Sequence, residues 1–487
     1  VTGVQTCALP ISPLDAGEVE VWDLETDVAV VGLGIAGTCA AIAAFEAGAR
    51  VLAFERAGAP GGTSALSGGL IYLGGGTPIQ EALGFHDTPA NMERFLLAAC
   101  GPDADADKVR AYCEGSVAHY HWLVDHGVPF RAEFCDEPNR EPVTEAGLCF
   151  SGGEDSWPFT EIADVVPRGH HPEFPDTAGG FIMERLTAAL GSTAVQVHTD
   201  ARVERLVVDA GRVVGLVVRV DGRDLTVRAA GGVVLAAGGF IFNEEMVAEH
   251  CPDAGRPFPA WRVGQDHDDG RGIRLGWGAG GATTRMGSFE CALPIGPPHR
   301  MARNILIGRD GKRFINEDTY TGRIGHQALA GRGGDIYMVV SEDTFEVNFV
   351  GMRIQWAAET PEELAADIGV PPAALAETIA AYNAGAERGE DPEWHKEPEF
   401  LVPLRPPLGA IDLRVESKAI YATFTLGGLT TDPESRVLDD RGHPVPGLFA
   451  AGRTTAGIAA HGYVSGISLG DGSFFGRRAG ESAARGA

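Results

Sequence analysis

Three closely spaced glycines carry the most recognisable chemistry in this sequence. Gly32, Gly34 and Gly37 stand in the spacing Gly-x-Gly-x-x-Gly, directly after the apolar run at 28–31. In this pattern the first glycine makes a tight turn, the second lets the backbone approach a pyrophosphate, and the third lets the following helix pack closely on the strand. Glu55 follows 18 residues after Gly37, where a carboxylate can accept hydrogen bonds from ribose hydroxyls. The pattern predicts a dinucleotide site at a strand-to-helix turn, with phosphate at the helix N-terminus.

A second loop of small residues indicates which dinucleotide binds. Residues 60–69 read Pro-Gly-Gly-Thr-Ser-Ala-Leu-Ser-Gly-Gly, just beyond Glu55. Such a loop lets the chain lie against an extended ribityl chain and a flavin, which an enzyme that binds only NAD does not need. Near the C-terminus, 447–452 reads as a strand meeting a glycine turn, and a helix over 466–479 brings the chain back to the same ligand. These features favour FAD over NAD.

The elements that must position these residues read as an α/β protein. A strand at 28–31, an Ala-rich helix at 38–48 and a strand at 51–54 form a βαβ unit, and short strands follow between 195 and 235. We expect a doubly wound, Rossmann-like FAD-binding domain that is discontinuous, with an inserted α+β capping domain. Residues 1–12 resemble a translated sequencing adapter, so we expect them to pack against nothing essential. The predicted ranges are an unstructured leader at 1–21, the first part of the FAD-binding domain at 22–290, the capping domain at 291–412 and the C-terminal part of the FAD-binding domain at 413–487.

Composition excludes several classes of function. The 67 acidic residues outnumber the 39 basic ones and give a formal charge of −28, which repels nucleic acid and anionic membranes. The eight cysteines form no Cys-x-x-Cys pair, which argues against a disulfide framework and a zinc ribbon and favours the reducing cytoplasm. No apolar stretch reaches 18 residues, so no transmembrane helix is expected. The scattered histidines do not form a ligand set, and we expect no metal.

Several motifs together resemble the fumarate reductase/succinate dehydrogenase flavoprotein superfamily. They are the Gly32 fingerprint, the loop at 61–69, the segment Ala236-Ala-Gly-Gly-Phe240 with Asn243, and the turn at 447–452. The resemblance implies FAD and a capping domain that closes over the flavin. Covalent attachment in that superfamily uses a histidine in the second Gly-rich loop. Because this chain has no histidine between Glu55 and His86, we expect FAD to be bound non-covalently.

The resemblance also implies a set of cofactor-binding residues, which come from the Gly-rich turns and from the segments that follow them. One member, Arg453, stands where the superfamily commonly has a glutamate, which leaves its contact with the ribityl chain open. The expected residues are Gly32, Gly34, Ile35, Ala36, Gly37, Glu55, Arg56, Gly62, Thr63, Ser64, Ser67, Gly68, Gly69, Arg202, Val203, Ala237, Gly238, Asp269, Gly452, Arg453, Gly466, Ser468 and Leu469.

The tail of the chain departs from the fumarate reductase pattern. Fumarate reductases end in a His-Gly-Ala-Asn-Arg segment whose arginine binds a dicarboxylate, whereas this chain has His-Gly-Tyr-Val-Ser-Gly at 461–466. A phenol cannot replace a bidentate cation, so fumarate is disfavoured. The segments 461–480 and 316–320 instead resemble flavin-dependent 3-ketosteroid dehydrogenases, and among these the Δ4-(5α)-dehydrogenases. That resemblance implies Tyr320, Tyr463 and Ser465 as catalytic residues and a 3-ketosteroid as the substrate.

These residue types suit the removal of hydrogen from a carbon pair next to a ketone. Tyr463, with a backbone N–H near Gly466, could hydrogen-bond the ketone oxygen and stabilise enolate character. Tyr320 could handle the proton with support from Ser465, while the flavin takes the hydride. A phenol with a pKa near ~10 is a poor base without help, so the division of roles between Tyr320 and Ser465 stays open. Ser465 could also simply cap the following helix.

Two other functions remain open from the sequence. One is an ene-reductase of the same superfamily that acts on another enone or on an enoate, for which inward-facing arginines would be the sign. The other is a flavin module that passes electrons to a partner, which the lack of Cys-x-x-Cys and Cys-x-x-Cys-His motifs disfavours. The physiological direction, the electron donor or acceptor and the oligomeric state are not determined by the sequence.

Overall fold

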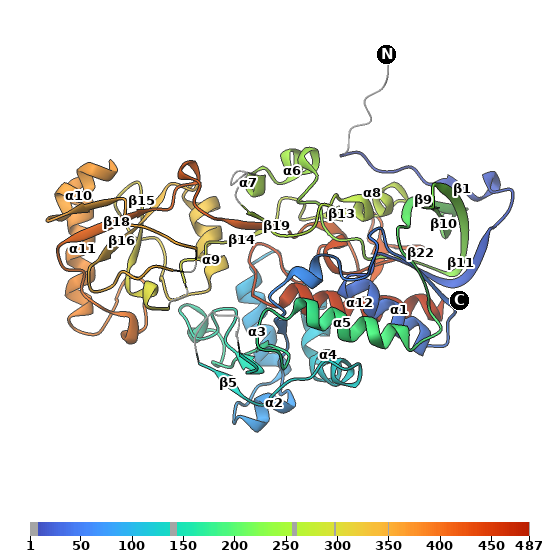
Figure 1. Ribbon diagram of the computed structural model, residues 1–487, viewed down its shortest axis with the longest axis horizontal. Coiled ribbons are helices and arrows are strands. Elements are labelled where there is room, and N and C mark those ends of the chain that lie inside the picture. The colour runs from blue at the N-terminus through green and yellow to red at the C-terminus, as the bar shows by residue number, and fades with distance from the viewer. Residues whose placement is uncertain (1–7, 137–143, 256–260, 297–298, 349, 487) are drawn as a thin grey trace, which may run out of the picture.

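The computed structural model describes residues 8–136, 144–255, 261–296, 299–348 and 350–486. Its largest sheet ends at the Gly-rich turn and has a parallel core in the spatial order β8, β3, β2, β11, β22. In Figure 1 this sheet lies at the end of the molecule where β9, β10, β11 and β22 are labelled. The strands of this sheet are β1 (Leu14–Asp15), β2 (Leu24–Val31), β3 (Val51–Phe54), β8 (Gln196–His198), β9 (Arg202–Asp209), β10 (Arg212–Val220), β11 (Arg223–Leu235), β21 (Arg436–Leu438) and β22 (Pro444–Ala450).

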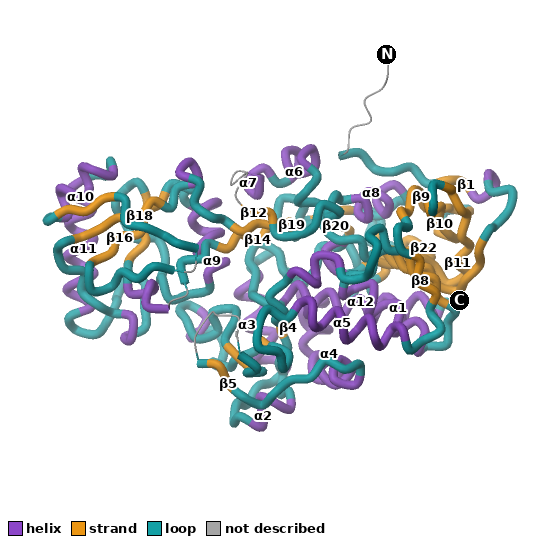
Figure 2. Tube along the Cα trace, in the orientation of Figure 1, coloured by secondary structure: helices purple, strands orange, loops and turns teal. Residues whose placement is uncertain are grey.

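The central strand β2 is buried on both faces, as its apolar run predicts. Val28 and Val30 face a layer of helices, whereas Ala29 and Val31 share a second core with the strands β9 and β10 and with α8 (Arg271–Gly278). Alternate residues of a strand point to opposite faces, so one apolar run supplies both cores. The helical layer consists of α1 (Ile35–Glu46), α5 (Gly179–Gly191) and α12 (Ile467–Arg485), which lie side by side under the sheet (Figure 2).

The long strand β11 joins two kinds of sheet. Its first half pairs with β10 in antiparallel fashion, and its second half pairs in parallel with β2 on one side and β22 on the other. The C-terminal strand therefore returns to the same sheet as the N-terminal βαβ unit. This confirms the predicted α/β class with a discontinuous FAD-binding domain.

A smaller sheet lies in the region to which the sequence assigned little. The strands β4 (Ile71–Tyr72), β7 (Gly169–His170), β6 (Leu148–Cys149) and β5 (Phe134–Cys135) pair in that order. Their neighbours α2 (Pro78–Ala82), α3 (Pro89–Cys100) and α4 (Ala106–Asp125) belong to the same half of the molecule. The fully buried ion pair between Arg168 and Asp87, at 2.8 Å, links this sheet to the helices.

A separate lobe occupies much of the range predicted for the capping domain. Its antiparallel sheet has the order β15 (Ile305–Gly308), β16 (Ile336–Ser341), β18 (Leu408–Asp412) and β17 (Trp356–Ala358). Ile305 and Ile307 share a core with α10 (Pro361–Ile368) and α11 (Pro372–Ala386), whereas Leu306 faces the core on the side of α9 (Thr321–His326). The lobe stands at one end of the molecule in Figure 1.

Two neighbouring strands connect the lobe to the FAD-binding domain. They are β14 (Phe289–Ala292), which leads into the lobe, and β19 (Ala422–Thr425), which leads out of it. The two strands are antiparallel, with Glu290 opposite Phe424. The short strands nearby are β12 (Trp261–Arg262), β13 (Thr283–Thr284) and β20 (Gly428–Leu429), and the helices above them are α6 (Glu244–His250) and α7 (Pro252–Gly255).

The described part of the N-terminal leader differs from the expected unstructured segment. β1 pairs in parallel with β9, and the Ile11 N–H donates to the Arg274 carbonyl at 2.9 Å. The Arg274 side chain donates to the Leu9 carbonyl at 2.7 Å. Residues 1–7 lie outside the described residues. Whatever its origin, the segment from residue 8 onward contacts the sheet edge and α8.

None of the helices in the described part of the chain has the length and apolar character needed to cross a bilayer. Within the same residues, no group of three or more histidines, cysteines or carboxylates is arranged to hold a metal ion. The seven cysteines there are all free thiols.

Candidate active site

The turn after β2 is built for close backbone approach. Gly32 has a φ of 91°, and a Cβ there would lie 2.5 Å from the Ala236 carbonyl oxygen. A Cβ on Gly37 would collide with the Gly32 carbonyl oxygen. Only glycine fits both constraints, because a side chain would push β2, β11 and α1 apart. The N-terminus of α1 carries partial positive charge, and no side chain at these two glycines blocks a phosphate group from reaching it.

Glu55 holds this turn as well as facing the cavity. One carboxylate oxygen accepts from the Leu33 N–H at 2.7 Å and the other from the Ala57 N–H at 2.8 Å. The side chain is buried and lines the cavity. Each oxygen has a further lone pair, so Glu55 can still accept the predicted hydrogen bond from a ribose hydroxyl. The structure adds a role in shaping the turn that the sequence analysis did not name.

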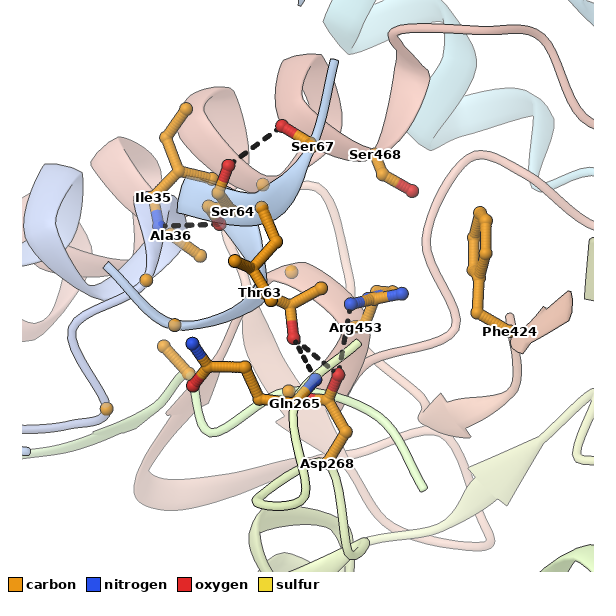
Figure 3. A pocket seen from close by; sticks show the side chains of 18 of the residues that line it. Ile35, Ala36, Thr63, Ser64, Ser67, Gln265, Asp268, Phe424, Arg453 and Ser468 are labelled. Carbon is orange, nitrogen blue, oxygen red and sulfur yellow. Dashed lines mark hydrogen bonds and ion pairs between the residues drawn. The ribbon is translucent and has the colours of Figure 1, made fainter. Parts of the chain in front are cut away.

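The second Gly-rich loop lies against the start of α1. It contains the short helix η2 (Gly62–Leu66), and Ser64 Oγ accepts from the Ile35 N–H at 3.1 Å. The Ser67 hydroxyl donates to the Ser64 carbonyl at 2.8 Å, as Figure 3 shows. The loop therefore extends the backbone surface beyond the helix N-terminus, as an elongated cofactor requires.

An aspartate outside the predicted set of cofactor-binding residues organises the middle of the cavity. Asp268 accepts from the Thr63 hydroxyl at 2.7 Å and pairs with Arg453 at 3.1 Å (Figure 3). The neighbouring Asp269, which was predicted, pairs instead with Arg56 at 2.6 Å. The run Asp-His-Asp-Asp-Gly at 266–270 is the sequence signal for this position. Only the backbone geometry shows which of its two adjacent carboxylates, Asp268 or Asp269, contacts Thr63 and Arg453.

All these segments surround one cavity of about 630 Å³. Every predicted cofactor-binding residue lines it except Gly37, which lies in the contact between α1 and the turn. The three predicted catalytic residues, Tyr320, Tyr463 and Ser465, line the same cavity. The structure thus brings the two predicted sets together around a single space, and the glycine turn, the helix N-terminus and the small-residue loop fit FAD.

Tyr320 and Tyr463 approach each other from the two sides of the cavity. Tyr320 precedes α9 in the lobe, Tyr463 precedes α12, and the ring centroids are 6.4 Å apart. The Tyr463 ring packs edge-on against Phe424 of β19, with centroids 5.3 Å apart. Apolar contacts thus fix the Tyr463 ring, which leaves its hydroxyl as the only polar group on that side chain.

The two hydroxyls have different partners. The Tyr463 oxygen accepts from the Ser468 N–H at 3.3 Å, so its own hydrogen is the group that can donate into the cavity. The Tyr320 hydroxyl donates to Glu290 at 2.9 Å, so its oxygen lone pairs are the groups that can accept. Burial raises the pKa of Tyr463, which keeps this phenol protonated as a donor.

Glu290 was not predicted from the sequence. It is 3% exposed on β14 and lines the cavity. Burial raises the pKa of this carboxyl to about 8, against the smaller lowering by hydrogen bonds from Tyr320 and the Cys291 backbone. A lone glutamate in a short apolar strand, 30 residues before Tyr320, gave no sequence signal.

Ser465 is held by its backbone and does not cap α12. Its N–H donates to the Ser151 carbonyl at 3.3 Å, and its carbonyl accepts from the Ser151 hydroxyl at 3.0 Å. The N-cap of α12 is Gly466, with a φ of 93° and no side-chain cap. Glu154 in turn accepts from the Ser151 N–H at 3.1 Å. The two loops are therefore joined, and the capping interpretation of Ser465 is wrong.

The fold, the glycine turn and the cavity define an FAD-binding oxidoreductase. A family model described as "FAD binding domain" matches residues 27–469, and the chain belongs to this family. It is similar to the crystal structure of the 3-ketosteroid-Δ4-(5α)-dehydrogenase from Rhodococcus jostii in complex with 4-androstene-3,17-dione. The two share 45% identity with a TM-score of 0.93, over 97% of this chain and 100% of that one.

Two curated proteins extend the comparison. The 3-oxo-5-alpha-steroid 4-dehydrogenase of Comamonas testosteroni is 27% identical over 90% of this chain and 94% of its own length. The NADH:acrylate oxidoreductase of Vibrio harveyi is 28% identical over 96% of this chain, but this chain spans only 52% of that protein.

Proposed function

We propose that this protein dehydrogenates the carbon–carbon bond next to the ketone of a 3-ketosteroid, as a Δ4-(5α)-dehydrogenase. The observation that carries the proposal is the pair of phenols that line the cavity, one disposed to donate into it and the other to accept. The 45% identity to the steroid-bound dehydrogenase supports the substrate class.

The charges around the cavity support a neutral substrate. The cavity is lined by four arginines, each of which already pairs with a carboxylate. Near the two phenols the wall includes the small and aromatic side chains of Ala292, Ala422 and Phe424, and its carboxylate, Glu290, is occupied by the Tyr320 hydroxyl. A dicarboxylate needs charge-assisted bidentate donors, whereas a ketosteroid needs an apolar wall and one donor for its oxygen. The arginines and their partners are Arg56 with Asp269, Arg202 with Glu204, Arg271 with Glu204, and Arg453 with Asp268.

The chain's own residues prepare the ketone and handle the proton. Tyr463 donates its hydrogen to the ketone oxygen, which acidifies the C–H bond on the neighbouring carbon. The oxygen of Tyr320 accepts that proton, and Ser465, which lines the same cavity, supports the transfer. Bound FAD supplies the acceptor for the hydride that leaves the second carbon.

We also propose that FAD is held without a covalent bond and that the protein acts in the cytoplasm. The absence of histidine from 56–85 supports the first, and the seven free thiols support the second. Acid precipitation should release the flavin into the supernatant. Yellow colour that stays with the precipitated polypeptide would overturn the non-covalent assignment.

The test of the function is anaerobic bleaching of the purified yellow protein by a panel of saturated 3-ketosteroids. A ketosteroid should reduce the flavin, and the corresponding 4-enone should accumulate as the product. Fumarate and urocanate serve as controls, offered to the chemically reduced protein. Rapid reoxidation by either acid, with no response to any ketosteroid, would replace this proposal by the ene-reductase alternative.

A further inference from the structure

We propose that Glu290 is the proton acceptor behind Tyr320, so that the hydrogen removed next to the ketone leaves the cavity through the phenol to this carboxylate. The inference rests on the proposed function and assigns a residue that acts through Tyr320 rather than on the substrate. It explains how a phenol can accept a proton although its unperturbed pKa is near ~10.

The geometry fixes the two groups against each other. The Tyr320 hydroxyl donates to Glu290 Oε1 at 2.9 Å, and the side chains are 7% and 3% exposed. Gly322, on the first turn of α9, leaves the space that this carboxylate oxygen occupies, because a Cβ there would collide with Oε1. The phenol and the space for its partner therefore come from the same turn, while the carboxylate comes from β14.

Among the residues that the structure describes, none gives Glu290 a cationic partner that would keep it charged. Arg323 of α9 donates instead to the Trp157 carbonyl, Asn316 and Thr319. β19 contributes no titratable side chain. Burial therefore raises the pKa of Glu290 to about 8, where it can gain and lose a proton near neutral pH. The titratable groups on the elements around it are Tyr320, Arg323 and His326 at α9, Asp253 on α7, Cys291 on β14, Cys100 on α3, and Tyr463 before α12.

The proposed step balances. The C–H bond next to the ketone breaks and its proton goes to the Tyr320 oxygen, while the Tyr320 hydroxyl proton moves to Glu290 Oε1. The electron pair of that C–H bond forms the new carbon–carbon double bond. Bound FAD would supply the acceptor for the hydride that leaves the adjacent carbon. Glu290 ends as a carboxylic acid, which returns its proton to solvent or to the product in the reverse direction.

The test compares the pH dependence of flavin reduction in the FAD-loaded wild type and in Glu290→Gln. The acceptor must be unprotonated, so the wild-type rate of anaerobic reduction by a saturated 3-ketosteroid should rise as pH increases through about 8. Glutamine keeps the size and an acceptor oxygen for Tyr320 but cannot take the proton. The variant should lose this rise and react about 10²-fold more slowly on the alkaline plateau.

The reverse direction gives an internal check, because it needs the opposite protonation state. Reoxidation of the reduced wild type by a 4-enone should slow as pH rises through the same value. A merely structural role for Glu290 would not produce mirror-image profiles that both disappear in one variant. In a Tyr320→Phe background, Glu290→Gln should have little further effect, since the carboxylate acts only through the phenol.

Each outcome decides between the possibilities. A Glu290→Gln variant with the wild-type rise overturns the inference while leaving the proposed function intact. If that variant fails to retain flavin, Glu290→Ala, which removes the carboxylate altogether, replaces it, and a rise at the wild-type pH again overturns the inference. If the wild type responds to no ketosteroid, the proposed function fails by itself. The same pH comparison, run as reoxidation by a small cyclic enone, then still decides the role of Glu290.

Discussion

The two tyrosines that line the substrate end of the cavity have the same side chain and opposite hydrogen-bond polarity. Tyr463, from the FAD-binding domain, accepts from a backbone N–H and has its hydrogen free to donate. Tyr320, from the lobe, donates its hydrogen to Glu290, so toward the substrate its oxygen acts as an acceptor. The contrast shows that the partner behind a phenol, rather than the phenol itself, determines whether it polarises a ketone or takes a proton.

The largest effect is expected on the accepting side. Tyr320→Phe removes the oxygen that receives the proton and leaves Glu290 without its donor, while the ring still packs. General base catalysis contributes about 10²–10⁴ in rate, and we expect a loss in that range. The measurement is the rate of anaerobic flavin reduction by a saturated 3-ketosteroid. A wild-type rate would eliminate the accepting role.

The donating side should be nearly as sensitive. Tyr463→Phe keeps the ring against Phe424 and removes the one hydrogen that reaches the ketone oxygen. Loss of a single donor of this kind costs about 10²–10³ in turnover. Unlike Tyr320→Phe, this variant should retain the rise in rate through about pH 8, because Glu290 and Tyr320 remain. Loss of that rise in Tyr463→Phe would show that the two phenols are not functionally separate.

A variant at the turn tests whether both phenol variants act on chemistry rather than on FAD binding. Glu55→Ala removes the acceptor for two backbone N–H groups and for the expected ribose hydroxyl. A hydrogen bond to a charged group is worth about 1.5–3 kcal/mol, so FAD should dissociate about 10- to 100-fold more readily. Flavin content after dialysis measures this. Both phenol variants, in contrast, should stay fully yellow.

The smallest effect is expected at Ser465, where a variant distinguishes a supporting role of the hydroxyl from direct proton transfer. Ser465→Ala removes a hydroxyl but keeps both backbone contacts with Ser151, so we expect a loss of only a few-fold, on the order of 1 kcal/mol, in the reduction rate. Ser151→Ala is the matched control, because it removes the bond to the Ser465 carbonyl and leaves the Ser465 hydroxyl. A greater than hundredfold loss in Ser465→Ala alone would make Ser465 the first proton acceptor in place of Tyr320.

The cofactor end of the cavity could be predicted because its chemistry is local in sequence. Gly32, Gly34 and Gly37 lie within one turn, and Glu55 ends the next strand, so spacing alone specifies the geometry. At 266–270 the same locality was less informative, because the predicted set named Asp269 and not its neighbour Asp268. Adjacent aspartates on one turn point in different directions, and only the fold shows that Asp268 meets Thr63 while Asp269 meets Arg56.

The substrate end could be predicted only in part, because its residues come from distant segments. Tyr320 and Tyr463 were identified through family resemblance. Which of them donates a hydrogen bond into the cavity and which accepts one depends on their partners, Glu290 and Ser468. Glu290 lies in a four-residue strand with no periodic signal, and its pairing with Tyr320 follows from the packing of α9 on β14. The hydrogen bond from the Ser151 hydroxyl to the Ser465 carbonyl joins residues more than 300 positions apart, and nothing in either local sequence indicates it.

The strands β14 and β19 are both the covalent connection to the lobe and part of the cavity wall. This has a consequence for protein engineering by recombination. A graft with junctions on the lobe side of these strands, at Leu293 and Tyr421, would exchange Tyr320 and keep Glu290 and Phe424. Junctions on the other side, between the strands and the FAD-binding domain, would transfer the wall together with the phenol. The phenol that accepts the proton and the carboxylate behind it therefore belong to different fragments, and the choice of junction decides whether a chimera receives the two from one parent or from both.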